Sequence, residues 1–342
     1  MDPAAPHEPK TLTEAIRYFS DLDVALQTMV RLRWPNGVIC PVCGTGNPLF
    51  LAKQRRWQCR NKHPGRQFSA KTGTVMEDSP LGLDKWFAAI WLITNAKNGI
   101  SSYEIHRAVG VTQKSAWFLL HRIRMAMKTG SFEKPSDGGS SPGGNAEAKE
   151  PAEFEADETF IGGQRKFMHK ARKEKLGKGR GTIGKEIVMG ILARSIANEP
   201  SRMLMAKRIP NTDMGVLQAE VRAVVKPGSH LYTDALRAYN GLGTDYLHEA
   251  VDHEIEYVKG RVHTNGMENF WSLFKRALKG TYTHMSGVHL DRYVDEQAFR
   301  FNEREMNDSQ RFRTVVSSVK GKRLTYRGLT GRDAREAKAT RD

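Results

Sequence analysis

The sequence contains few cysteines, no long apolar run and no basic leader. Its three cysteines, an odd number within one 20-residue window, argue against a disulfide framework. No stretch of about 18 consecutive apolar residues is present, which excludes a membrane-spanning helix. Residues 1–10 carry acidic residues and prolines where a secretory signal has a basic and then an apolar segment. We therefore expect a cytoplasmic protein with no membrane partner.

Basic residues outnumber acidic ones. The 342 residues include 54 Lys and Arg against 38 Asp and Glu, which gives a formal net charge of +16. Such an excess indicates a polyanionic partner where the charge is clustered, and residues 164–185 hold nine basic residues and one acid. We expect this block either to contact nucleic-acid phosphates or to form a solvated loop. The candidate phosphate contacts are Lys166, Lys170, Arg172, Lys173 and Arg180.

The cysteines have the spacing of a zinc site. Cys40 and Cys43 enclose Pro-Val and precede a glycine, the tight turn that directs two thiolates at one ion. Tetrahedral zinc needs two further ligands, and Cys59 and His63 offer a thiolate and an imidazole four residues apart. We interpret the four as a structural Cys3His zinc ribbon that needs the metal to fold. Three buried thiols beside an unrelated histidine are the alternative.

A helical pattern runs through residues 83–127. Ser101 stands three residues before Glu104, which predicts a capping box at the start of one helix. Gly110 ends that helix and Thr112 caps the next one. This layout is typical of a helix-turn-helix DNA-binding segment, with an ordinary helical hairpin as the alternative. In the DNA-binding interpretation, the second helix directs Gln113 and Lys114 at the major groove, and Arg122 and Arg124 at phosphates.

A second domain follows a stretch rich in Gly, Ser and Pro at residues 134–151, which is typical of a flexible linker. Several β-prone runs and one helix follow it. This alternation predicts an α/β domain with a central sheet. We expect strands at 154–160, 186–193, 202–209 and 230–233, and a helix at about 212–224.

Three acids of this domain have positions that suit metal ligands. Asp157 lies inside a β-prone run, where an unpaired carboxylate is costly. Asp234 ends a short strand, where open α/β sheets bind ligands, and Glu268 lies early in a helix. Three carboxylates can hold two Mg²⁺ ions for in-line phosphoryl transfer, and Lys275, about two turns beyond Glu268, would reach a phosphate. Singly, Asp234 also fits a turn or cap residue, and Glu268 an acid that favours the helix dipole.

These segments together resemble a known family, the DDE transposases of bacterial insertion sequences that begin with a zinc ribbon and a helix-turn-helix. The similarity runs from about Trp34 to Asn302. It rests on CPVCG at 40–44, SYEIHRAVGVTQKSAWFLLHRIR at 102–124, EADETFIGG at 155–163, YTDALRAY at 232–239 and HTNGMENFWSLFKRALKGTY at 263–282.

The resemblance implies an RNase H-like catalytic domain in which Asp157, Asp234 and Glu268 hold two Mg²⁺ ions and Lys275 contacts DNA near the scissile phosphate. Asn269 is the alternative to Glu268, because some relatives carry Asn as the last ligand. This sequence departs from many relatives in offering His63 where they have a fourth Cys, and in its long linker.

The expected protein is therefore multidomain. Its parts are an N-terminal helical extension at 1–30, a zinc ribbon at 31–75, a helix-turn-helix region at 80–130, a flexible linker at 131–152, an α/β RNase H-like catalytic domain with a mixed central sheet at 153–318, and a polar basic tail at 319–342.

The expected function is that of a nucleoid-associated transposase. It would bind the terminal inverted repeats of its element as a homodimer or larger assembly, cleave double-stranded DNA and transfer it to target DNA with Mg²⁺, and hold structural Zn²⁺. Two alternatives stay open: a zinc-ribbon DNA-binding regulator without catalysis, and a metal-dependent nuclease without end joining.

Overall fold

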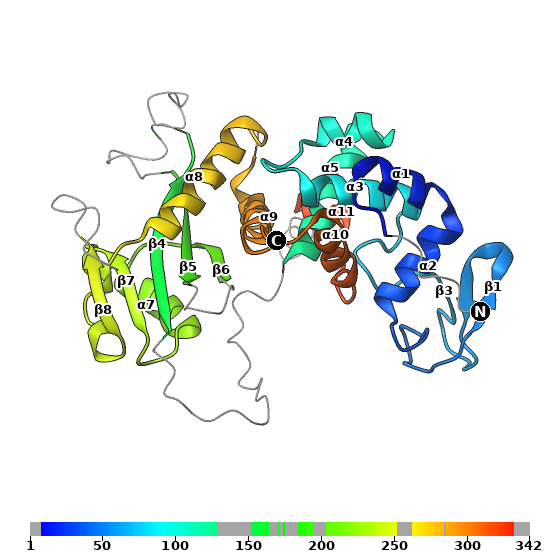
Figure 1. Cartoon of the computed structure of the whole chain (residues 1–342), viewed down its shortest axis with the longest axis horizontal. Helices are drawn as coiled ribbons and strands as arrows, with labels where there is room; N and C mark the ends of the chain where they lie inside the picture. The colour runs from blue at the N-terminus through cyan, green and yellow to red at the C-terminus, as the bar shows by residue number, and fades with distance from the viewer. Residues whose placement is uncertain are drawn as a thin grey trace, which may run out of the picture. The chain divides into compact units, whose positions relative to one another are not determined.

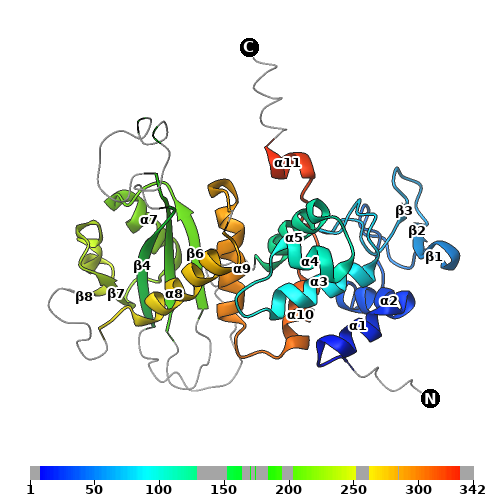
Figure 2. The same ribbon diagram turned by 90° about the horizontal axis from the view of Figure 1, so that it is seen from above.

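The structure is a computed structural model and describes residues 8–128, 152–163, 170, 174, 184–194, 203–251, 262–283 and 285–331 (Figure 1 and Figure 2). The chain divides into two compact units, one formed by residues 1–129 and 303–342, the other by residues 130–302. Within the described residues, no helix is both long and apolar enough to cross a membrane.

Unit 1 is built around a set of helices with an aromatic core. Its helices are α1 (Leu12–Ser20), α2 (Leu22–Arg33), α3 (Leu83–Asn95), α4 (Ser102–Val109), α5 (Gln113–Met127), α10 (Asp308–Ser317) and α11 (Tyr326–Thr330). The ring of Phe312, on α10, lies 5.1 Å from Phe19 and 5.3 Å from Phe87. Burial of such rings provides the main stabilisation of the helical core and joins α10 to α1 and α3.

The boundaries of α4 and α5 confirm the capping signals predicted for residues 101–112. Ser101 and Glu104 form a capping box at the start of α4, and Gly110 ends it in the left-handed conformation with φ of +66°. The Thr112 hydroxyl accepts a hydrogen bond from the backbone N–H of Ser115 and so caps α5.

The zinc-ribbon segment forms a small antiparallel sheet of order β1-β2-β3, from β1 (Leu49–Leu51), β2 (Arg56–Gln58) and β3 (Gln67–Phe68), with a 3₁₀ turn η1 at Ala52–Gln54. The rings of Trp34, Trp57 and Phe68 pack together, with centroids 5.7 to 6.3 Å apart. Arg33 stacks on Trp34 and donates hydrogen bonds to two backbone carbonyls of residues 70–72. Its guanidinium therefore joins α2 to the end of the ribbon.

Unit 2 has a mixed five-stranded sheet of order β6-β5-β4-β7-β8. The strands are β4 (Glu153–Ile161), β5 (Glu186–Ala193), β6 (Met203–Ile209), β7 (His230–Asp234) and β8 (Leu247–Val251). β5 is antiparallel to β4 and β6, whereas β4, β7 and β8 run parallel. Four of the five strands were predicted within a residue or so. β8 was missed because it is a largely exposed edge strand with a weak apolar pattern.

Helices cover both faces of this sheet (Figure 1 and Figure 2). α8 (Asn265–Gly280) and α9 (Leu290–Asn302) lie on one face, over a cluster that includes Leu192, Leu204 and Phe270. α7 (Met214–Val224) lies on the other, over Met189 and Ile191. After Glu186, β5 carries only apolar residues and one glycine, because helices cover the sheet on both faces. Short 3₁₀ turns η3, η4 and η5 lie at Arg237–Tyr239, Leu242–Thr244 and Gly287–His289.

Two expected boundaries differ from those in the structure. α2 continues to Arg33, past the boundary expected at residue 30. The structure divides the chain after Asn302 instead of residue 318, because the apolar face of α10 packs in unit 1. Residues 131–151 of the expected linker lie outside the described residues.

Candidate functional site

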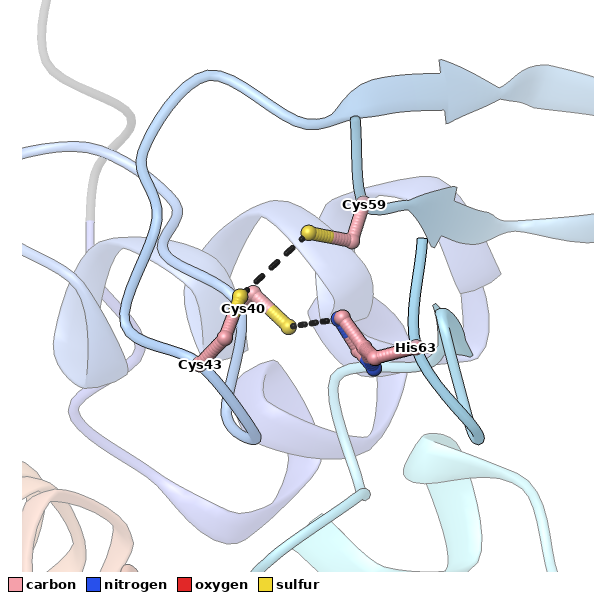
Figure 3. A group of neighbouring side chains, drawn as sticks. All are labelled: Cys40, Cys43, Cys59 and His63. Atoms are coloured by element: carbon pink, nitrogen blue, oxygen red, sulfur yellow. Dashed lines mark hydrogen bonds between the residues drawn. The ribbon is translucent and has the colours of Figure 1, made fainter. Parts of the chain in front are cut away.

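The four predicted zinc ligands lie together (Figure 3). Their ligand atoms all lie within 4.8 Å of one another; Cys40 Sγ is 3.5 Å from His63 Nε2, and Cys43 Sγ is 3.5 Å from Cys59 Sγ. Two sulfurs bound to one tetrahedral zinc ion are about 3.8 Å apart, so this arrangement fits the metal. Among the described residues, it is the one group of three or more Cys, His, Asp or Glu side chains close enough to hold an ion.

Hydrogen bonds with neighbouring groups favour the protonation states of His63 and Cys43 that bind zinc. His63 Nδ1 lies 2.8 Å from the Pro64 carbonyl oxygen, so it carries the proton and leaves Nε2 as the ligand atom. The hydroxyl and backbone N–H of Thr45 hydrogen-bond the sulfur of Cys43 and lower the pKa of that thiol to about 6. Zinc binds the thiolate form of cysteine. The residues present therefore fit a structural zinc ion.

Asp157 and Asp234 lie level with each other on adjacent parallel strands. Glu155 of β4 pairs with Tyr232 of β7. Asp157 follows Glu155 by two residues and Asp234 follows Tyr232 by two residues. The side chains of the two acids therefore leave the sheet on the same face. Both carboxylates are half-buried. Sheet register thus brings together two predicted acids that are 77 residues apart in the sequence.

Helix α8 adds the third acid to this face. The indole Nε1 of Trp271 donates a hydrogen bond of 2.9 Å to Asp157 Oδ2. Glu268 is exposed and precedes Trp271 by three residues, which places both on one side of the helix. Lys275 follows Trp271 by four residues and is also exposed. Asn269, the alternative ligand, is exposed on α8 as well.

The pKa of Asp157 reflects its burial and the charges of the other two acids. Burial, the charge of Asp234 and that of Glu268 raise the pKa of Asp157 to about 6, against the opposing hydrogen bonds from Trp271 and the Glu158 N–H. In the described part of the chain, these three carboxylates lie farther apart than the ligand atoms of the zinc cluster. Perturbed carboxyl pKa values of this kind are typical of functional sites.

Sequence reasoning missed several polar residues around these acids. On the opposite face of β4, Glu158 accepts a 2.8 Å hydrogen bond from the Tyr239 hydroxyl, and burial is the main cause that raises its pKa to about 7. Trp271 was expected only as part of a motif, not as a hydrogen-bond donor. For Glu155, which lies on the same face as Asp157, the alternating acids of the Glu153–Asp157 segment were the available signal, because such alternation places carboxylates on one face of a strand.

The candidate DNA-binding residues of α5 have different environments. Lys114 is exposed, with its Nζ 4.8 Å above the Tyr326 ring, and Gln113 donates a 2.9 Å hydrogen bond to the Ser102 hydroxyl. Arg122 and Arg124 are instead only 5% and 1% exposed. In this structure these two arginines are not accessible to phosphates, contrary to their expected role.

The burial of Arg122 has a clear physical basis. Its guanidinium lies 5.4 Å from the centre of the Trp86 ring and 5.2 Å from that of Phe118, and it donates to the Glu77 carbonyl. In the basic block, Lys170 is exposed, whereas Lys166, Arg172, Lys173 and Arg180 lie outside the described residues.

Comparisons with known proteins agree with this division of the chain. A family model of a transposase zinc-ribbon domain matches residues 21–61, and one of the ISXO2-like transposase domain matches residues 151–302. A protein of the transposable element ISH50 from Halobacterium salinarum is 27% identical over 261 residues, 74% of this chain and 82% of the relative. A transposase-like protein from Haemophilus influenzae is 31% identical over 99 residues, 29% of this chain and 80% of the relative. No solved structure matches the chain.

These matches define a transposase with an N-terminal zinc ribbon. The chain belongs to the ISXO2-like transposases of insertion sequences. The matched ribbon range includes all three cysteines and ends two residues before His63.

Proposed function

We propose that this transposase cleaves DNA at the ends of its element and joins the released ends to target DNA, with Asp157, Asp234 and Glu268 as metal ligands. The observation that carries the proposal is the level placement of Asp157 and Asp234 on β4 and β7, beneath the helix that bears Glu268. The mixed sheet covered by helices on both faces supports the RNase H-like fold that the family resemblance implies.

The donor set fits Mg²⁺, which prefers carboxylate oxygens. Two such ions would neutralise charge and polarise the oxygens of an in-line phosphoryl transfer. Burial and the charges of Asp234 and Glu268 raise the pKa of Asp157, and a cation held between the three acids would relieve the repulsion among them.

The chain's own side chains would orient the reacting groups. Trp271 fixes the carboxylate of Asp157 through its N–H, so that carboxylate is preorganised. Lys275, two turns beyond Glu268 and exposed, would bind a phosphate beside the scissile one. Glu268 is the preferred third acid over Asn269, because the spacing to Trp271 and Lys275 places all three on one side of α8.

Unit 1 would supply recognition of the terminal inverted repeats. The zinc ribbon would be a rigid support, and the exposed start of α5 would enter the major groove with Gln113 and Lys114. The basic segment that contains Lys170 would add phosphate contacts. Because two element ends must be joined, the active form would be a homodimer or a larger assembly on DNA.

A cleavage and joining assay tests this proposal. The zinc-loaded protein, a labelled end duplex, supercoiled target and Mg²⁺ would be compared with Asp157→Asn, and with Asp213→Asn at the start of α7 as the control. We expect the parent and the control to cut and join, and Asp157→Asn to bind the duplex without cutting it. Cutting by Asp157→Asn at the parental rate would contradict the assignment. Hydrolysis without joined products would identify a nuclease.

A further inference from the structure

The N-terminus of α8 is capped by a side chain from the central strand of the sheet. Glu155 of β4 is 2% exposed, and its Oε2 accepts a 2.8 Å hydrogen bond from the backbone N–H of Met267, in the first turn of α8. First-turn N–H groups have no partner within their own helix, and a carboxylate there also interacts favourably with the helix dipole. Glu155 therefore takes the role that a local capping residue has in α4 or α5.

The other oxygen of Glu155 belongs to a second set of contacts. Its Oε1 accepts a 2.8 Å hydrogen bond from Arg194 Nε, at the end of β5. Arg194 also donates to the carbonyl of His263, just before α8, and lies 4.2 Å above the ring of Tyr232 on β7. One buried carboxylate thus connects β4, β5 and the start of α8.

The approach of α8 to the sheet is too close for a side chain at one position. A Cβ atom on Gly266 would lie 2.4 Å from Leu192 Cδ2 and 2.8 Å from Glu155 Oε2. Real Cβ atoms essentially never show contacts that short. A side chain at 266 would therefore have to displace Leu192 or the Glu155 carboxylate from the start of the helix.

From this geometry we propose that Glu155 is a positioning residue of the transposase: it fixes α8 on β4 so that Glu268 and Trp271 face Asp157. Glu155 and Asp157 leave β4 on the same face, two residues apart, and contact successive turns of α8 through Met267 and Trp271. A shift of α8 would move Glu268 relative to the two aspartates. This inference rests on the proposed metal-dependent function.

Two independent substitutions perturb the same contact. Glu155→Gln places an amide NH₂ against either Met267 N–H or Arg194 Nε–H, so one acceptor is lost. Gly266→Ala places a methyl group against the Glu155 carboxylate and Leu192, so the carboxylate or the helix must shift. Gly280→Ala is the matched control, because a Cβ at the last residue of α8 meets no described atom within 4 Å.

Two quantities are measured on the zinc-loaded full chain. Electron paramagnetic resonance gives the affinity for Mn²⁺, and a cleavage assay gives the dependence of the rate on the Mg²⁺ concentration. Residues that orient metal ligands typically change metal affinity or activity by about 10–100-fold when replaced. We expect Glu155→Gln and Gly266→Ala each to weaken Mn²⁺ binding by that factor and to raise the Mg²⁺ concentration for half-maximal cleavage. The Mn²⁺ affinity of Gly280→Ala should stay within about twofold of the parental value. The same limit should hold for the affinity of every variant for end DNA. The double variant should lose less than the product of the single effects, because both act through α8.

Each outcome has a separate meaning. Parental Mn²⁺ affinity in both variants, with only a lower thermal midpoint, would overturn the positioning role and leave the proposed function intact. If the parent binds no Mn²⁺, or if Asp157→Asn binds Mn²⁺ as tightly as the parent, the proposed function is wrong, and the positioning role is wrong with it.

Discussion

Trp271 on α8 donates its indole N–H to the carboxylate of Asp157 on β4, over a distance of 2.9 Å. The ring reaches this position because Asp157 pairs with Gly190 across β4 and β5. A Cβ on Gly190 would lie 2.2 Å from the Met267 methyl and 3.0 Å from the Trp271 ring. The absence of a side chain at position 190 therefore leaves the space in which the Trp271 ring reaches Asp157.

Gly190→Ala should destabilise unit 2 and reduce cleavage. The added methyl group displaces Met267 and the Trp271 ring, and overpacking of this kind costs about 1–3 kcal/mol. Chemical denaturation of the zinc-loaded protein measures the change. Gly243→Ala, where a Cβ meets no described atom within 4 Å, should change the free energy of unfolding by less than about 0.5 kcal/mol. Equal stabilities of the two variants would refute the packing argument.

Asp157→Asn should stabilise the Mg²⁺-free protein at alkaline pH. The folded state raises the pKa of Asp157 from 3.8 to about 6, so ionisation opposes folding. This cost grows as the pH rises from about 4 to 6 and is constant above that range, where it is on the order of 2–3 kcal/mol. The thermal midpoint of the variant should exceed that of the parent at pH 8, with a smaller gain at pH 5. A thermal midpoint of Asp157→Asn below that of the parent at pH 8 would show that ionisation of Asp157 does not oppose folding.

The zinc ribbon should depend on all four predicted ligands. We expect one zinc ion per chain by atomic emission, and loss of zinc in Cys59→Ser and His63→Ala. His63→Cys should retain it, because thiolate is an equally suitable ligand. Loss of the ion should unfold the ribbon, since such sites contribute roughly 10–16 kcal/mol to folding. Full zinc affinity in His63→Ala would place the fourth ligand elsewhere.

Lys114→Ala should weaken binding to end DNA by about tenfold, because the proposed function places this exposed lysine at a base edge, where a good contact is worth roughly 1–3 kcal/mol. Arg17→Ala, which removes an exposed charge from α1, is the charge-matched control and should change the affinity by less than about twofold. Fluorescence anisotropy at two salt concentrations measures both. Equal losses in the two variants would indicate only a general charge effect.

Local signals in the sequence predicted local structure well. Ser101, Glu104 and Thr112 fix where α4 and α5 begin because their side chains bond to nearby backbone N–H groups. The clustering of the zinc ligands followed from the short separation of Cys40 and Cys43 and the nearby Cys59 and His63, and is confirmed.

Features that depend on distant packing were not predictable in this way. The burial of Arg122 depends on the Trp86 ring, 36 residues away, and the charge alone suggested exposure. The position of α10 in unit 1 depends on Phe312 meeting rings of α1 and α3. The capping of α8 by Glu155 joins residues 112 positions apart. Such pairings are set by tertiary structure, which one sequence does not specify by periodicity.

The most direct test of the catalytic assignment compares the two later acids in a strand-transfer assay. Zinc-loaded parent, Asp234→Asn, Glu268→Gln and Asn269→Ala would be incubated with a labelled end duplex, supercoiled target and Mg²⁺. We predict joined products from the parent and from Asn269→Ala, and bound but uncut duplex from Asp234→Asn and Glu268→Gln. Binding by all four proteins without cleavage in Mg²⁺ or Mn²⁺, or joined products from Asp234→Asn, would contradict the account.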